Sequence, residues 1–355
     1  MPLDAALVGV EPKQSPLVTN AILTWSMNYV AGSVPSYLPI EKKYFDNTIS
    51  NKPPPLHPLF VASVQEVIGA WAALYASGVT KIEVIRHPFI HYTYDAIFYD
   101  TGLSGDILST KVHLVGVGNH RSGGHFLTSN TTRNQNGYLI NKSWWGGIVL
   151  GLNTVDLKES YIEQPPLRPK PSKSNLQDKR HGVAVFSSLI ESNYYDIDIP
   201  ATQAHLFDGC IRDPRNVKAP SSDINTHTSL DFALKGGLDG RNLNGMCLLS
   251  FVFAYISYKL QDAVKKKKLK YKNKILDEQI NIKLNKVGAT FGAPVILGFI
   301  PIRVVLEIVS EMYDMETNTV TIHFNVLTNK NAKAIKDGYF IVNLHKANDG
   351  TNSKL

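Results

Sequence analysis

Residues 243–264 read LNGMCLLSFVFAYISYKLQDAV, a stretch in which apolar side chains recur at helical spacing. Segments rich in β-branched and aromatic residues follow it at 289–296, 300–314, 319–329 and 338–344, separated by glycine- and asparagine-containing turns. We therefore expect one long helix followed by a meander of antiparallel strands that wraps around it.

The same order of elements occurs earlier in the chain. Residues 57–78, HPLFVASVQEVIGAWAALYASG, predict a helix that ends at Gly78. The strand-like segments that follow it are 90–100, 106–118, 124–133 and 137–151. Each half closes on a Gly-Tyr-aliphatic strand. Two such units in one chain would pair pseudo-symmetrically, in the way that the subunits of a homodimer pair.

A stretch rich in proline, lysine and serine separates the two units. Residues 164–181, QPPLRPKPSKSNLQDKRH, have no apolar period and predict a semi-extended linker. This places one domain at 1–163, a second at 182–345 and a flexible polar tail at 346–355. Because only the second unit carries a polar segment of acids, amides and imidazole before its helix, we expect the chemistry to lie there.

The bulk composition is that of an ordinary soluble protein, with 43% hydrophobic and 19% charged residues in 355. Two cysteines do not make a disulfide framework and fit a reducing compartment. We predict no membrane span, because no segment reaches the roughly 18–20 apolar residues required. The net charge of +7 favours an anionic partner. The lysine run at 265–274 has no aromatic platform beside it, so we do not expect nucleic-acid binding.

The last three residues, Ser353, Lys354 and Leu355, form the tripeptide that the peroxisomal import receptor reads. The residues before them are polar, as an exposed address requires. We therefore expect a peroxisomal location and the import receptor as a partner. Peroxisomes process acyl groups as coenzyme A thioesters, whose phosphates would suit the basic charge of the chain.

The polar segment SSDINTH at 221–227 offers an acid and a base close together. In a catalytic interpretation, His227 takes a proton from water, while Asp223 orients that water and delivers a proton. Asn225 holds either the water or the loop. The N–H of Gly245 begins the following helix, where unpaired amides favour an anion and glycine permits close approach.

An ordinary structural interpretation of the same residues stays open. Short polar side chains cluster in turns because they bond to nearby backbone groups, and Asn244 is a common type of helix N-cap. His57 precedes the first predicted helix as Asn244 precedes the second, and we expect His57 to be structural.

The order and spacing of these residues resemble the MaoC-like (R)-specific enoyl-coenzyme A hydratases, including the hydratase portion of the peroxisomal multifunctional β-oxidation enzyme. The family signature is roughly Gly-Asp-x-Asn-Pro-x-His, then Phe-Ala, then His-Gly-Met. The matching segments here are 222–227, 232–233 and 244–246. This chain has one residue fewer between Asp and His, lacks the proline, and has Asn244 in place of the last histidine. Upstream, Asp213 and Asn216 are an alternative signature pair.

The resemblance implies an α+β, tandem (double) hot-dog fold, in which each half is an antiparallel sheet wrapped around a long helix. It also implies reversible addition of water to trans-2-enoyl-coenzyme A, giving the (3R)-hydroxyacyl product. The domain at 1–163 would then bind the acyl chain without catalysing the reaction, and the domain at 182–345 would carry the catalytic loop. The thioester is then the substrate, and no cofactor or metal is expected; a homodimer is possible. Two alternatives stay open: a specialised dehydratase, isomerase or cyclase of secondary metabolism, and a non-catalytic protein that binds acyl thioesters.

Overall fold

The computed structural model of the chain describes most of both halves. The described residues are 3–10, 17–39, 44, 53–62, 89–152, 154, 156–171, 192–211, 225–267, 270–271, 274–275, 280–314 and 316–346.

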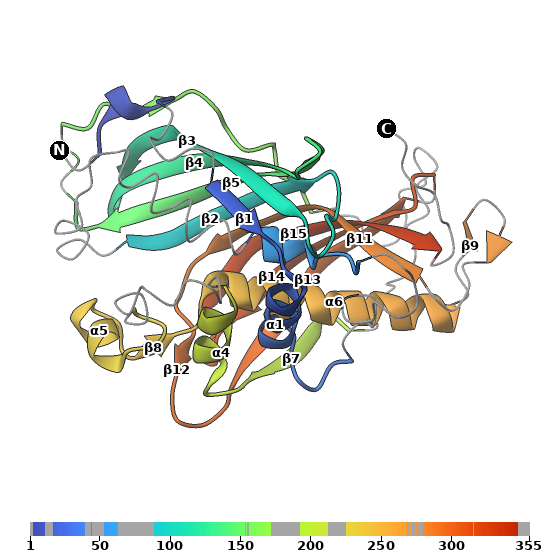
Figure 1. The fold of residues 1–355 in the computed structure, drawn as a ribbon. Helices are drawn as coiled ribbons and strands as arrows, with labels where there is room; N and C mark the ends of the chain where they lie inside the picture. The colour runs from blue at the N-terminus through green and yellow to red at the C-terminus, as the bar shows by residue number, and fades with distance from the viewer. Residues whose placement is uncertain are drawn as a thin grey trace.

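One large antiparallel sheet of eleven strands runs through both halves (Figure 1). Its order is β1-β3-β4-β5-β2-β11-β15-β14-β13-β7, with β6 paired to β3. The first half contributes β1 (Leu17–Asn20), β2 (Phe89–Phe98), β3 (Ile107–His120), β4 (Gly123–Arg133), β5 (Leu139–Leu150) and β6 (Ser160–Tyr161). The second half contributes β7 (Tyr194–Ile199), β11 (Ile280–Phe291), β13 (Ile302–Asp314), β14 (Thr319–Leu327) and β15 (Lys333–Lys346).

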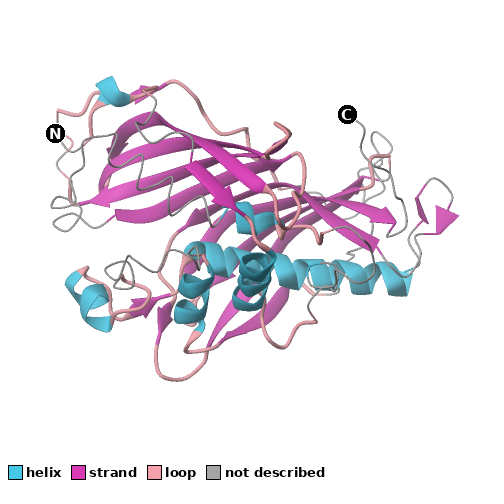
Figure 2. Ribbon diagram, viewed as in Figure 1, coloured by secondary structure: helices cyan, strands magenta, loops and turns pink. Residues whose placement is uncertain are grey.

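The described helices are the short 3-10 helix η1 (Ala5–Leu7), the helical residues 58–62, and the α-helices α1 (Leu23–Ser33), α4 (Gln203–Cys210), α5 (Leu230–Lys235) and α6 (Gly245–Lys267). In Figure 2, α1, α4 and α6 lie close together below the first-half strands, whereas η1 lies above those strands. Two small ribbons complete the described elements. One pairs β8 (Arg241–Asn242) with β12 (Ile296–Leu297), and the other pairs β9 (Lys270–Tyr271) with β10 (Lys274–Ile275).

The sheet order is palindromic, which confirms the repeat expected from the sequence. Read inward from its edges, β1-β3-β4-β5-β2 matches β7-β13-β14-β15-β11. The two halves meet where Thr93–Ile97 of β2 pair with Lys286–Thr290 of β11, a junction that we call the seam. The repeat is larger than predicted, because each half also begins with a short strand and a short helix. Those helices, α1 and α4, pack on each other, and the Gln203 side chain donates to the Gly32 carbonyl.

The predicted second helix is confirmed as α6. Asn244 caps it, because its Oδ1 accepts from the Met246 N–H at 2.8 Å. Cys247 is fully buried in this helix, and burial raises the pKa of its thiol, as a structural cysteine requires. Of the first predicted helix, residues 58–62 are helical and 63–78 lie outside the described residues.

Most predicted strands are confirmed, but the bounds predicted for the strand at 289–296 are wrong. β11 ends at Phe291, and its pairing begins much earlier, at Ile280. The physical reason lies in Pro294, which cannot donate to a sheet ladder and ends the run before β12. The alternating residues 280–288 belong to the same strand, which the prediction missed.

Residues 160–171, which we call the strap, contact β3, β5, β2, β11 and β14 in turn. Tyr161 lies against Gly116 and Gly118 of β3, where any added Cβ would lie 2.2–2.3 Å from the tyrosine. Glu163 accepts from the Trp144 Nε1–H of β5 at 2.6 Å. Near the other end of the strap, the Pro169 carbonyl lies 3.1 Å from Nε2 of His323 on β14. The described part of the predicted linker is therefore extended and docked.

The domain boundaries at 163/164, 181/182 and 345/346 stay predictions, since a continuous sheet joins the halves. In the part of the chain that the structure describes, no helix is both long and apolar enough to span a membrane.

Candidate functional site

The Asn225 side chain organises the polar loop before α5. Its Oδ1 accepts from the backbone N–H groups of His227 at 2.8 Å and Thr228 at 3.1 Å. Its Nδ2 donates to Asp208 Oδ1 on α4 at 2.9 Å. Of the two roles considered for Asn225, this geometry is that of a residue that holds the loop. Asp208, which is 9% exposed, had no signal in the sequence beyond being an acid on a short helix.

The His227 ring is oriented by a backbone carbonyl. Its Nδ1 lies 2.8 Å from the Asn242 oxygen. A carbonyl only accepts, so Nδ1 carries the hydrogen, and in the neutral ring Nε2 is then the nitrogen that can take a proton. The Asn242 N–H in turn donates to the Thr226 oxygen at 3.2 Å. These two bonds tie the histidine loop to the residues that lead into α6.

The first residue of α6 presents an amide that suits a developing anion. Among the described residues, the Gly245 N–H has no hydrogen-bond partner. A Cβ at this position would lie 2.8 Å from the Phe291 ring. Only glycine fits there without a shift of the ring, and the neighbouring helix dipole favours negative charge. This is the arrangement that an oxyanion-binding amide requires.

Aromatic rings connect Gly245 to the first half of the chain. The Phe291 ring of β11 lies 4.5 Å from the His91 ring of β2. His91 in turn lies 4.8 Å from Trp145 of β5, measured between ring centroids. The surroundings of Gly245 are therefore built from both halves. Sequence reasoning did not single out His91, because its position beside the site depends on the pairing across the seam.

The described candidates form one connected group: Asn225 bonds to the loop that carries His227, and His227 bonds to the segment that leads into Asn244 and Gly245. Their catalytic roles stay predictions. Both candidate acids, Asp223 and Asp213, lie outside the described residues, as do Asn216, Ser353, Lys354 and Leu355. The choice between the two acids therefore stays open.

A second group of ionisable rings surrounds Tyr92 in the first half. The His120 and His125 rings lie 5.1 and 6.2 Å from it, and His125 Nδ1 is 2.9 Å from the Tyr161 hydroxyl. Burial lowers the pKa of His125 to about 4. Across the described ranges, no three His, Cys, Asp or Glu side chains gather as a metal site. The absence of a cofactor or metal stays a prediction.

No protein-family model and no curated protein matches the sequence. Solved structures do match it. A MaoC-like dehydratase from Phytophthora capsici is 13% identical, with 96% of this chain and 97% of that chain covered and a TM-score of 0.61. A Mycobacterium tuberculosis protein described as a double hotdog fold is 13% identical, with 93% and 96% covered and a TM-score of 0.52.

The full-length peroxisomal multifunctional enzyme type 2 of Drosophila melanogaster is also similar, with 14% identity and a TM-score of 0.56. The match covers 92% of this chain and 48% of that enzyme, so the chain spans about half of its length. These likenesses establish the fold. The chain is an α+β protein with a double hot-dog fold, and the fold predicted from the resemblance is confirmed.

Proposed function

We propose that the chain is a hydratase or dehydratase of acyl thioesters, which reversibly adds water to trans-2-enoyl-coenzyme A and gives the (3R)-hydroxyacyl product. The observation that carries this proposal is the hydrogen-bonded connection between His227 and the residues that precede the Gly245 amide. It supports the proposal because it ties the loop of the candidate base to the segment that precedes the candidate anion-binding donor. The shared fold with MaoC-like dehydratases supports the reaction class.

In the proposed addition, His227 Nε2 takes a proton from water, and the water oxygen bonds to C3 of the enoyl group. The electron pair of the double bond moves toward the thioester oxygen, which the Gly245 N–H binds. Asp223, or Asp213 in its place, gives a proton to C2. Proton transfer from His227 back to the acid restores both groups.

The test is the hydration of a medium-chain trans-2-enoyl-coenzyme A, followed as loss of enoyl absorbance. We expect His227→Ala to lower kcat by about 10²–10⁴-fold, the usual contribution of a general base. Asp223→Asn and Asp213→Asn identify the acid, because only one of them should abolish turnover. His113→Ala, on β3 of the first half, is the matched control and should leave turnover unchanged. Full activity of His227→Ala would refute the mechanism.

The same assay separates the alternatives. Thioester binding without turnover in the wild type would assign a non-catalytic protein. A product with a shifted double bond or a ring, in place of the hydroxyacyl thioester, would assign a specialised enzyme on the same fold. One observation favours both alternative functions: Asn244 acts as a helix cap, at the position where the family that this chain resembles has histidine.

We also propose a peroxisomal location, supported by Ser353-Lys354-Leu355 and by the peroxisomal enzyme among the structural neighbours. A fluorescent protein fused before residue 1 should enter peroxisomes, and deletion of Leu355 should leave it in the cytosol. Uptake that is unchanged by the deletion would refute the assignment. A homodimer also stays a prediction, which sedimentation of the purified chain tests.

A further inference from the structure

The carboxylate of Asp208 on α4 is connected to the candidate base through one side chain. Asp208 is 9% exposed, and its Oδ1 accepts from Asn225 Nδ2 at 2.9 Å, across 17 positions of the sequence. The Oδ1 atom of Asn225 accepts from the His227 backbone N–H at 2.8 Å. Two consecutive hydrogen bonds therefore join Asp208 to the backbone of His227.

Asp208 stands on a helix that the first half of the chain holds in place. The Trp25 Nε1–H of α1 donates to the Cys210 carbonyl at the end of α4 at 2.8 Å. The ring of Phe207, which precedes Asp208 in the chain, is buried and lies 5.9 Å from the Tyr29 ring of α1, measured between centroids. Because α4 is fixed by α1, the carboxylate is presented from a packed support.

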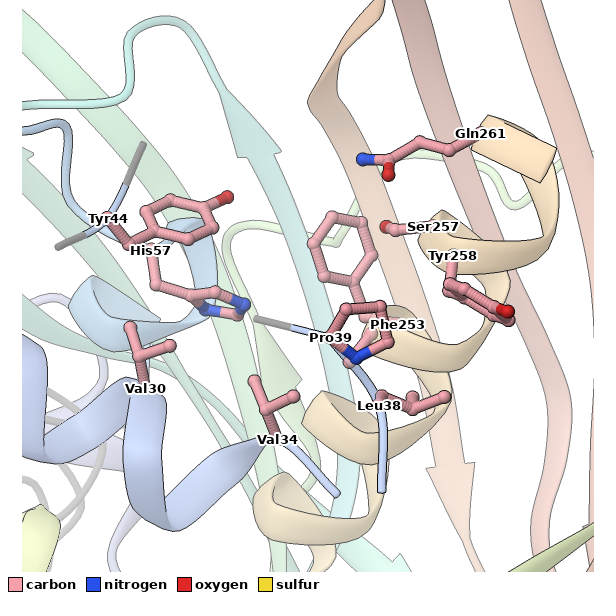
Figure 3. A pocket seen from close by; sticks show the side chains of 11 residues that line it. Val30, Val34, Leu38, Pro39, Tyr44, His57, Phe253, Ser257, Tyr258 and Gln261 are labelled. Carbon is pink, nitrogen blue, oxygen red and sulfur yellow. The ribbon is translucent and has the colours of Figure 1, made fainter. Parts of the chain in front are cut away.

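The helix α1 is itself held by the long helix α6. Val30 of α1 and Phe253 of α6 line one small pocket between these helices (Figure 3). Nearer the start of α6, the buried Ser250 hydroxyl lies 3.0 Å from the Tyr29 hydroxyl of α1. Because α6 begins at Gly245, the support of the carboxylate and the candidate anion-binding amide are tied to the same helix.

The carboxylate of Asp208 determines which way the Asn225 amide faces. A carboxylate only accepts hydrogen bonds, so Nδ2 of the amide faces α4 and Oδ1 faces the loop. There Oδ1 accepts from the backbone N–H groups of His227 and Thr228 at 2.8 and 3.1 Å. A reversed amide would direct its own N–H groups at both of these donors and lose all three bonds. The bond to a charged acceptor is also stronger than one between neutral groups.

We propose that Asp208 is a positioning residue for His227. By fixing the Asn225 amide, it holds the loop in the conformation in which His227 Nδ1 donates to the Asn242 carbonyl at 2.8 Å. That bond leaves Nε2 as the nitrogen that takes a proton. The effect on turnover rests on the proposed function, whereas the orientation of the ring does not.

The orientation of the ring is measured by NMR of the full chain, labelled with ¹⁵N in its histidines, at about pH 8.5, where an ordinary histidine is neutral. The His227 signals are those that disappear in His227→Ala. The wild type and Asp208→Asn, which keeps an acceptor oxygen, should show a single tautomer with the hydrogen on Nδ1. Asp208→Ala should move both ring nitrogens toward the averaged shifts of a ring that populates both tautomers. Gln203→Ala is the matched control, because Gln203 is also buried on α4 but bonds to the Gly32 carbonyl, and it should leave the shifts unchanged.

The hydration assay gives a second measurement. Asp208→Ala should lower kcat by about tenfold, the effect of one hydrogen bond, with KM little changed. In a His227→Ala chain the same change should have no further effect, because a positioning residue acts only through the residue that it positions. An equal loss in that chain would overturn the proposal.

Ring signals of Asp208→Ala that match those of the wild type would also overturn it, as would equal shifts in Gln203→Ala. If Asp208→Ala does not fold, Asn225→Asp removes the same bond from the other side, keeps the Oδ1 acceptor and should move the ring nitrogens in the same way. A wild type without hydratase activity, in which these shifts still occur, would refute the proposed function and leave this inference standing.

Discussion

The Arg168 guanidinium on the strap binds both halves of the sheet. Its Nε and Nη2 donate to the two carboxylate oxygens of Asp95 on β2, each at 2.8 Å. Its Nη1 donates to Thr290 Oγ1 of β11 at 2.8 Å, and its Nη2 also donates to the Ala289 carbonyl at 2.9 Å. One side chain therefore holds both strands of the seam with these four hydrogen bonds, and two longer ones of 3.5 Å reach the Tyr94 and Asp337 carbonyls. We predict that Arg168→Met strongly destabilises the fold.

The size of the expected destabilisation follows from the burial of the Asp95–Arg168 pair. The Asp95 side chain is 3% exposed and that of Arg168 is 24% exposed, so removal of the arginine leaves a carboxylate in a dry site. Loss of one partner from a buried pair costs about 3–5 kcal/mol. Burial already raises the pKa of Asp95, against the effect of Arg168, so the carboxyl can take up a proton when the arginine is gone. We therefore expect Arg168→Met to lower the free energy of unfolding by about 3 kcal/mol. This is a large share of the total of about 5–15 kcal/mol that is typical of a folded protein.

The assay is equilibrium unfolding in urea of the wild type, Arg168→Met and the double variant Asp95→Asn/Arg168→Met. The double variant removes the unpaired Asp95 carboxylate and should recover part of the lost free energy of unfolding. Arg303→Met is the matched control, because Arg303 pairs with Asp198 in an exposed ion pair and should leave the midpoint unchanged. The reasoning is refuted if Arg168→Met unfolds like Arg303→Met, or if the double variant is no more stable than the single one.

Two further predictions concern the site and the pH response. Gly245→Ala brings a Cβ to 2.8 Å from the Phe291 ring, so the shifted amide should lower kcat by about 10²–10³-fold; Gly298→Ala, where a Cβ meets no atom within 4 Å, should not. Because burial lowers the pKa of His125 from 6.5 to about 4, the unfolded chain binds a proton first as the pH falls. Stability should fall as the pH drops from about 6.5 to 4, by at most about 3 kcal/mol from this group. His125→Gln should lose that part of the pH dependence in urea unfolding, and an unchanged profile would contradict the burial argument.

The parts of the fold that could be predicted are those whose own pattern determines their structure. The apolar period of 243–264 predicts α6 within a few residues of its bounds, and the alternating first-half segments match β2 to β5. The helices α1 and α4 were missed because they are short and stabilised by each other. The bond from Gln203 to the Gly32 carbonyl spans 171 residues and leaves no local trace in the sequence.

The candidate site also contains residues that the sequence could group together and one that it could not. Asn225, His227, Asn244 and Gly245 lie within 21 positions of one another, and their order was sufficient to group them. His91 belongs to the surroundings of Gly245 only because β2 pairs with β11, and no spacing in the sequence encodes that pairing.

The two helix starts explain why, in the proposed function, only the second half of the repeated fold would carry out the reaction. Both begin with a side chain that accepts the N–H two residues ahead, His57 in one half and Asn244 in the other. The next residue differs in a decisive way: Gly245 offers an N–H and space for an oxygen, whereas Pro58 offers neither a donor nor a small surface. Replacing Pro58 with glycine would restore a donor without the His227 loop beside it. We therefore expect Pro58→Gly to add no hydratase activity to a His227→Ala chain, and activity above that of His227→Ala alone would show that the helix start is sufficient.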